Sequence, residues 1–93
     1  MPPGFLETAG SYYLIESGSC GSDLISTTSE CSAAATALDL YEKTAHDLTY
    51  QWSLSYPPGC QVEYPNMLFV MGGSSNGSCS FAIQCICMFT PPS

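Results

Sequence analysis

The sequence predicts an α+β domain in which one short helix packs on a small antiparallel sheet and three disulfides stabilise the fold. Three observations lead to this prediction. One segment has the apolar period of a helix, several short segments are rich in aromatic and β-branched residues, and six cysteines occur in 93 residues. A chain of this length forms one domain whose core alone gives modest stability, so the cysteines supply much of the rest.

The predicted helix is the segment Thr27–Leu40. Thr27 and Glu30 have the spacing of a capping box, in which the Thr hydroxyl takes the Glu amide and the Glu carboxylate reaches back to the cap. One helical face is expected to lie close against the sheet because its side chains are small or apolar. These residues are Cys31, Ala34, Ala35 and Leu38.

The domain is expected to occupy residues 11–89, between an N-terminal arm and a C-terminal tail. Residues 1–10 open with Pro-Pro-Gly and predict an extended arm with little to hold it. Residues 90–93 form a polar tail that contains two prolines. Within the domain, the aromatic and β-branched content of Ser11–Glu16 predicts the first strand.

The middle of the chain gives weaker signals. Tyr41–Tyr56 has no clear period, and we expect a helical tail followed by a short strand at Thr49–Leu54. Tyr56–Cys60 contains two prolines and a glycine, which is typical of a rigid turn. Gln61–Tyr64 then predicts another short strand.

Two apolar runs near the C-terminus, Met67–Met71 and Ser80–Phe89, predict a hairpin with a mobile tip at Gly72–Ser78. Alternation in the second run gives two largely apolar faces, which indicates a central strand covered by the helix on one side. One face would carry Phe81, Ile83, Cys85 and Cys87, and the other Ala82, Gln84, Ile86 and Met88.

An even number of cysteines in a short chain favours disulfides and an oxidising compartment. A zinc site is the alternative, but the chain has no Cys-x-x-Cys pair and His46 lies outside any ligand spacing. Residues 1–4 lack the features of a signal peptide, so we expect that an upstream targeting segment has been removed and that Met1 is not the biological start. The six cysteines are Cys20, Cys31, Cys60, Cys79, Cys85 and Cys87.

The charge balance excludes some partners. One basic and eight acidic residues give a net charge of −7. Because phosphate contacts need Lys and Arg, nucleic acid is excluded and anionic membrane surfaces are disfavoured. No run approaches the ~20 apolar residues of a membrane helix. The acidic charge is explained equally well by solubility and by attraction to a basic partner.

Catalytic groups are sparse, and we expect no enzyme, no cofactor and no metal. A nucleophile–base pair would need His46 with a serine and either Asp39 or Asp47, yet no nucleophile turn accompanies them. Paired carboxylates drawn from Glu42, Asp47 and Glu63 would need a cleft that so small a domain seldom has. His46 is best explained as a surface histidine; ligation of a chlorophyll magnesium or a metal ion is the alternative.

Aromatic side chains are the best candidates for binding, because such residues are favoured where a surface meets a protein or a sugar ring. The alternative is that several of them fill a core short of leucine and valine. The binding candidates are Tyr41, Tyr50, Trp52, Tyr56 and Tyr64. The methionines expected in the core are Met67, Met71 and Met88.

Residues 76–78, Asn-Gly-Ser, form an N-glycosylation sequon on the expected hairpin tip. Asn76 is therefore a candidate glycosylation site. The pair Asn76-Gly77 is equally well explained as turn chemistry.

The ordered pattern resembles a small cysteine module that is common in predicted secreted or lumenal proteins of dinoflagellates and other single-celled algae. The resemblance covers residues 12–88, and its helix-on-sheet plan is also similar in architecture to PAN/apple modules. Its motifs are Glu30-Cys31-x-x-Ala34-Ala35-x-x-Leu38-x-Leu40, Pro57-Pro58-Gly59-Cys60, Leu68-Phe69 and Ile86-Cys87, with Tyr13, Gly18-x-Cys20 and Ile25.

The resemblance implies a disulfide framework but no catalytic residues. It suggests that Cys31–Cys60 ties the helix to the sheet and that Cys20–Cys87 ties the first strand to the last. Cys79 and Cys85 would be an addition to the framework, and their bridge would close a small loop at the base of the hairpin. Spacing alone leaves many pairings open.

Together these features predict a non-enzymatic, disulfide-stabilised binding or assembly module that acts through protein–protein contacts. One alternative is a small accessory subunit on the lumenal side of an algal photosystem–antenna complex. Another is a secreted domain that binds carbohydrate or protein. The expected location is accordingly the thylakoid lumen or the extracellular space.

Overall fold

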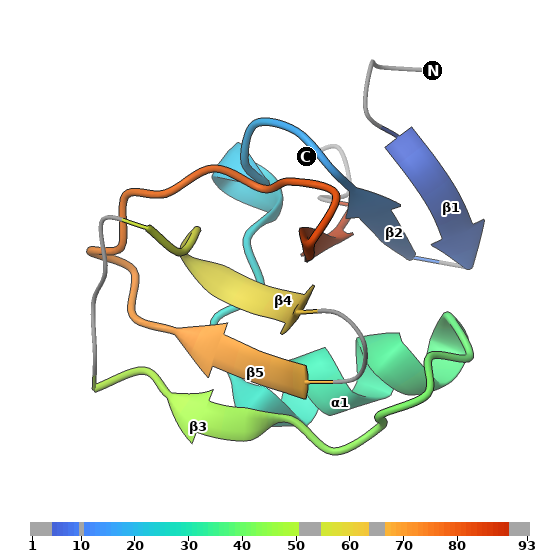
Figure 1. The fold of residues 1–93 in the computed structure, drawn as a ribbon. Helices are drawn as coiled ribbons and strands as arrows, with labels where there is room; N and C mark the ends of the chain where they lie inside the picture. The colour runs from blue at the N-terminus through green and yellow to red at the C-terminus, as the bar shows by residue number, and fades with distance from the viewer. Residues whose placement is uncertain (1–4, 10, 51–54, 64–66, 90–93) are drawn as a thin grey trace.

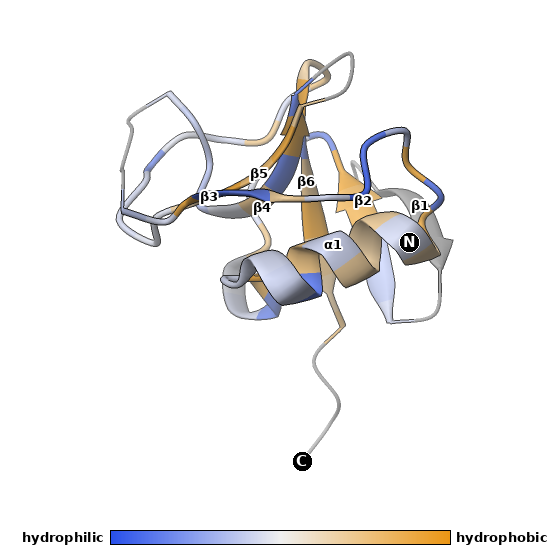
Figure 2. Ribbon diagram, turned by 90° about the horizontal axis from the view of Figure 1, so that it is seen from below, coloured by the Kyte–Doolittle hydropathy of each residue, from blue (hydrophilic) through white to orange (hydrophobic). Residues whose placement is uncertain are grey.

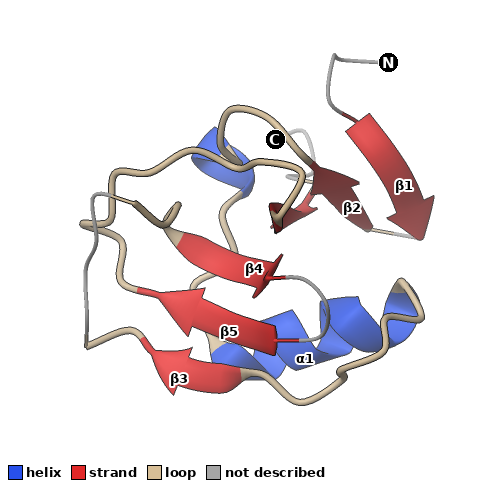
Figure 3. Cartoon of the chain, viewed as in Figure 1, coloured by secondary structure: helices blue, strands red, loops and turns tan. Residues whose placement is uncertain are grey.

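The structure is a computed structural model that describes residues 5–9, 11–50, 55–63 and 67–89. Helix α1 lies against one face of a sheet, and long loops cross the other face (Figures 1 and 3). The prediction of an α+β fold with one short helix on a small sheet is confirmed. The elements are β1 (Phe5–Ala9), β2 (Tyr12–Ile15), the 3₁₀ helix η1 (Gly21–Asp23), α1 (Thr28–Ala37), β3 (His46–Leu48), β4 (Gly59–Glu63), β5 (Met67–Met71) and β6 (Ile83–Met88).

Six strands of the described residues form one sheet in the order β1-β2-β6-β4-β5-β3. All neighbouring pairs are antiparallel except β3 and β5, which are parallel. The prediction of an antiparallel sheet is therefore wrong at one edge, and the sheet is mixed. β3 follows α1 in the chain and pairs with the outer edge of β5. No local sequence pattern predicts a pairing between strands so far apart in the chain.

Thr49 and Tyr50, the first two residues of the strand expected at Thr49–Leu54, form a turn after β3. The Asp47 carboxylate accepts hydrogen bonds from the Thr49 amide at 3.0 Å and from the Thr49 hydroxyl at 2.6 Å. This local turn ends the strand at Leu48, because a side chain that bonds the backbone two residues on competes with sheet pairing. Residues 51–54 lie outside the described part of the chain.

Helix α1 begins as predicted, with Thr27 as its N-cap. The Thr27 hydroxyl accepts a hydrogen bond from the Glu30 amide at 3.2 Å. The second half of the capping box is wrong, because the Glu30 carboxylate accepts a hydrogen bond from the Tyr12 hydroxyl of β2. Glu30 therefore joins the first turn of the helix to the sheet. The predicted inner face is confirmed: Cys31, Ala34, Ala35 and Leu38 are all buried.

The helix ends at Ala37, three residues before the predicted end. Asp39 takes a left-handed backbone conformation with φ of 55°. The Leu40 amide bonds the Ala35 carbonyl at 2.9 Å, and the Asp39 amide bonds the Thr36 carbonyl at 3.1 Å. This is a Schellman cap, which satisfies the last helical carbonyls and turns the chain towards β3.

The predicted hairpin between Met67–Met71 and Ser80–Phe89 is wrong. β4 lies between β5 and β6, and β5 instead pairs with β4. The loop after β5 is anchored at two distant places: the Gly77 amide bonds the Tyr56 carbonyl at 2.9 Å, and the Cys79 amide bonds the Gly18 carbonyl at 2.8 Å. These bonds carry the chain across the sheet to the far side of β4 (Figure 1).

β6 is the central strand that the alternation predicts, with β2 on one side and β4 on the other. It begins at Ile83, so Phe81 and Ala82, expected on its two faces, lie before the strand and are exposed. Ile86 belongs to the core cluster beneath α1, whereas Cys85 and Cys87 belong to a second cluster on the opposite face. In Figure 2, β2, β5 and β6 are coloured as hydrophobic, while α1 is mostly pale. The helix therefore contributes close approach to the sheet more than apolar area.

The three disulfides have the pairing that the resemblance implies: Cys20–Cys87, Cys31–Cys60 and Cys79–Cys85. Cys31–Cys60 joins α1 to β4 within the helix-side cluster. The other two bridges lie in the opposite cluster, beneath loops. Cys79–Cys85 joins the loop that precedes β6 to β6 itself and is not at the base of a hairpin.

Part of the expected N-terminal arm is held in the sheet. Phe5–Ala9 is β1, which pairs with β2 in antiparallel register with an irregularity between Phe5 and Glu7. Residues 1–4 and the C-terminal residues 90–93 lie outside the described residues.

Candidate functional site

The structure separates the five aromatic binding candidates into different settings. Tyr41 is 84% exposed and Tyr50 is 74% exposed. In the sequence they lie on either side of β3, the edge strand, which forms the lower edge of the sheet in Figure 1. Trp52 and Tyr64 lie outside the described residues.

Tyr56 has a structural role rather than an exposed one. Its ring packs edge-on against Phe69 of β5, with centroids 5.6 Å apart. Its hydroxyl lies 3.1 Å from each carboxylate oxygen of Glu63, and this hydrogen bond raises the pKa of Tyr56. For Tyr56, the core-filling alternative for the aromatic set is the better description.

The β3 edge carries charge beside the two exposed tyrosines. His46 and Asp47 are both exposed. The hydrogen bonds from the Thr49 hydroxyl and amide lower the pKa of Asp47, so this carboxylate is ionised at neutral pH. Tyr41 lies in the loop that leads into β3, Asp47 in β3 and Tyr50 in the turn that follows it, and all three are exposed. These three residues are here called the β3 edge surface.

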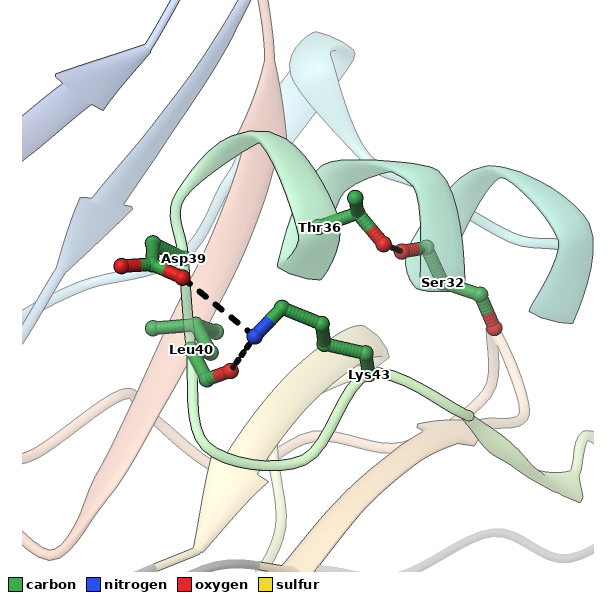
Figure 4. Close-up of polar contacts among 5 residues, drawn as sticks. All are labelled: Ser32, Thr36, Asp39, Leu40 and Lys43. Carbon is green, nitrogen blue, oxygen red and sulfur yellow. Dashed lines mark hydrogen bonds and ion pairs between the residues drawn. The ribbon is translucent and has the colours of Figure 1, made fainter.

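The only lysine is occupied within its own loop. The Lys43 ammonium donates to the Leu40 carbonyl at 2.8 Å and lies 3.3 Å from the Asp39 carboxylate (Figure 4). It supports the end of α1 electrostatically, where the helix dipole favours a cation. The chain therefore presents a surface potential set by its acidic residues, with a net charge of −7.

Three further apolar side chains are exposed that the sequence analysis had not singled out as surface groups. Met67, expected in the core, is 53% exposed at the start of β5, and Phe81 is 75% exposed before β6. Phe89 is 44% exposed and stacks on Tyr13 with ring centroids 4.4 Å apart. All three stand at or just beyond strand ends, which is the signal that could have identified them. Met71 is buried, as predicted, and Met88 is half-buried against the helix-side cluster.

Two more tyrosine–carboxylate pairs tie β2 to its neighbours. The Tyr12 hydroxyl donates to Glu30 of α1, and the Tyr13 hydroxyl donates to Asp23 of η1. The bond to Glu30 raises the pKa of Tyr12. Burial, followed by the bond to Asp23, raises the pKa of Tyr13 to about 12. These pairs lock both faces of β2.

The catalytic candidates are not brought together. His46 and Asp47 are adjacent in β3, so their side chains point to opposite faces of the strand. Asp39 is paired with Lys43, and Glu63 with Tyr56. Among the residues that the structure describes, no group of three His, Cys, Asp or Glu side chains could hold a metal ion.

Asn76 lies exposed in the loop between β5 and β6, which is not a free hairpin tip. Ser75 beside it is buried, and the loop is tied to Tyr56 through the Gly77 amide. The expectation of a mobile tip is therefore corrected: the loop lies against the segment that precedes β4.

In the described parts of the chain, no helix has the length and apolar character needed to span a membrane. No family model, curated protein or solved structure matches this chain.

Proposed function

We propose that this chain is a non-enzymatic binding or assembly module that contacts a protein partner through the β3 edge surface. The observation that carries the proposal is the exposure of two tyrosines, 84% and 74%, one in the loop before the edge strand β3 and one in the turn after it. Tyrosine is enriched among residues that dominate binding energy, because it buries a large amphipathic area at a small cost in conformational entropy.

The charge of the surface supports a basic partner. Asp47 is ionised and exposed in the middle of β3, and Lys43 is neutralised within its own loop. A second copy of the chain is disfavoured, because two molecules of charge −7 repel and each edge would present Asp47 to the other. We infer a partner segment that is rich in Lys or Arg. Its cationic side chains would pair with the acidic charge and would also contact the faces of the tyrosine rings by cation–π interaction.

A matched set of variants tests this proposal. The double variant Tyr41→Ser/Tyr50→Ser removes both rings, and Phe81→Ser removes a similarly exposed ring away from β3. Each tagged chain is expressed in source cells, cross-linked and recovered, and its partners are quantified by mass spectrometry. We expect the double variant to lose at least about tenfold in partner recovery. Unchanged recovery, or an equal loss with Phe81→Ser, would contradict the proposal.

Asp47→Asn tests the electrostatic part separately. Asparagine keeps a side-chain oxygen for the Thr49 amide but carries no charge. The expected result is slower association and a weaker dependence of affinity on salt, because charges near an interface act mainly on the rate of encounter. Identical salt dependence in the two proteins would remove Asp47 from the interface.

A narrower proposal is an accessory subunit on the lumenal side of an algal photosystem–antenna complex. Three disulfides are consistent with an oxidising compartment, and the motif resemblance points to algae. Co-migration with a pigmented membrane complex would support it. A free extracellular species that binds a glycan array would support the other alternative, a secreted carbohydrate-binding domain.

A further inference from the structure

The loop between β5 and β6 contains the sequence Asn-Gly-Ser at residues 76–78. The packing of the loop requires the glycine but neither of the other two residues. A Cβ atom on Gly77 would lie 2.5 Å from both the carbonyl carbon and the carbonyl oxygen of Ser55. Only glycine fits this close approach, and its amide bonds the Tyr56 carbonyl at 2.9 Å. Gly77 is therefore required by packing.

Asn76 and Ser78 are not required in the same way. Both are exposed, and neither side chain makes a hydrogen bond or ion pair within the part of the chain that the structure describes. The turn in this loop closes upstream, through the bond from the Ser75 amide to the Gly72 carbonyl at 3.0 Å. Asn76 lies after this turn, so turn chemistry does not account for it.

We propose that Asn76 is an N-glycosylation site whose sugar donor is a lipid-linked oligosaccharide pyrophosphate. The residue two positions on supplies the required hydroxyl, Ser78, and the intervening residue is not proline. The three disulfides are consistent with an oxidising compartment, and the secretory pathway is one that also carries the transferase. In the folded chain the Asn76 side chain faces solvent, so an attached glycan displaces no contact.

The transfer leaves a balanced set of bonds. A bond forms between the Asn76 side-chain nitrogen and the anomeric carbon of the first sugar. The bond from that carbon to the pyrophosphate oxygen breaks, and the lipid pyrophosphate leaves while the amide nitrogen gives up one proton. No oxidation or reduction is involved.

The anchoring of the loop sets the order of events. In the folded chain the Gly77 amide is bonded to Tyr56, and Cys79–Cys85 closes the segment just beyond the sequon. A transferase must draw the acceptor segment into its own site, so transfer has to precede the docking of this loop. The glycan is then carried into the folded state on an exposed side chain.

The test is secretion of the full chain, behind a signal peptide, from a eukaryotic host. Intact mass is measured before and after an amidase that removes N-linked glycans and leaves Asp. We expect a heterogeneous mass increase that the amidase abolishes, and its loss in both Asn76→Gln and Ser78→Ala. Ser78→Thr keeps the hydroxyl and should retain the glycan. In vitro, with purified transferase and donor, the reduced, unfolded chain should be modified and the folded chain should not.

A matched control uses another loop of the same molecule. Glu42→Asn creates a sequon with Lys43 and the exposed Thr44, in the segment between α1 and β3. Glycan at position 42 with none at Asn76 would overturn the assignment. Secretion of a disulfide-complete chain that carries no sugar, or failure of the unfolded chain to be modified in vitro, would overturn it equally.

Discussion

Asp39 holds the end of α1 in a backbone conformation that most L-residues avoid. Its φ of 55° places it at the position of a Schellman cap where glycine is usual. Its carboxylate pairs with Lys43 at 3.3 Å on the surface, which contributes little. The free-energy cost of this backbone conformation is therefore larger than the stabilisation that the ion pair with Lys43 contributes.

Replacing Asp39 tests this balance. The left-handed conformation costs an L-residue about 1–2 kcal/mol, and glycine avoids this cost. Glycine also makes the unfolded chain more flexible, which lowers the free energy of unfolding by about 0.5–1 kcal/mol. We expect Asp39→Gly to raise the free energy of unfolding by about 0.5 kcal/mol, and Asp39→Ala to lower it by about 1 kcal/mol. Urea unfolding of the two variants measures both; equal effects would contradict the strain.

Gly59 combines a left-handed backbone conformation with a position where an added side chain would be crowded. Its φ is 82°, and an added Cβ would lie 2.5 Å from Leu24 Cδ1 and 2.8 Å from the Ile25 carbonyl oxygen. That carbonyl cannot move freely, because it accepts the Cys60 amide at 3.0 Å. We expect Gly59→Ala to cost at least about 2 kcal/mol. Gly73, which has open space around it, is the control: Gly73→Ala should change unfolding by less than about 0.5 kcal/mol.

The tyrosine–carboxylate pairs give stability a dependence on alkaline pH. The unfolded chain releases the Tyr13 proton at the ordinary pKa of 10.0, whereas the folded chain keeps it until pH is about 12. Because the folded state binds more protons in this window, the contribution of Tyr13 to the free energy of unfolding is fully present below pH ~10. It is lost as pH rises towards 12. The pKa values of Tyr12 and Tyr56 are raised as well, so their contributions fall in the same direction.

Unfolding by urea from about pH 8 to about pH 11 measures this loss. Tyr13→Phe keeps the ring against Phe89 and removes the titrating hydroxyl, so the variant should lose less stability across the range than the wild type. Equal slopes for the two proteins would show that Tyr13 does not carry the effect.

At the scale of the element, the sequence predicted what depends on neighbouring residues. The Thr27 cap, the buried face of α1 and the two faces of β6 all follow from local spacing. The end of α1 was missed because Asp39 replaces the glycine that usually marks it.

The order of the strands was missed because it depends on contacts between residues far apart in the chain. Gly77 docks on Tyr56, Cys79 bonds Gly18, and β3 joins β5 rather than a sequence neighbour. The same limit applies to the candidate site. Residue type identified Tyr41 and Tyr50 as candidates, but only the fold shows that the strand between them in the sequence is an edge strand. Likewise, only the fold shows that Tyr56 packs against Phe69.

The disulfides should contribute different amounts to the free energy of unfolding, according to the length of the chain segment that each one closes. Cys20–Cys87 spans 67 residues and Cys79–Cys85 spans 6. Loop-closure entropy then gives about 4 kcal/mol for the first and about 2 kcal/mol for the second. Replacing each pair by alanine and comparing urea unfolding tests this ranking. A larger loss for the Cys79/Cys85 pair would show that local packing, not chain entropy, dominates.

The whole molecule is a sheet supported differently on its two faces. A helix and one disulfide cover one side, while loops held by two disulfides cover the other. Of the catalytic candidates, Asp39 is paired with Lys43 and Glu63 with Tyr56, and His46 is exposed at the surface. The surface carries acidic charge and exposed tyrosines, the two features on which the proposed binding function rests.

The most direct test of this account is the native size of the chain in an extract of its source cells. Gel filtration at low and high salt, followed by mass spectrometry for this chain, gives that size without a tag. A binding module with a basic partner should migrate well above 9.9 kDa at low salt and shift towards that mass as salt rises. Migration as a free 9.9 kDa chain at every salt concentration would contradict the proposed function.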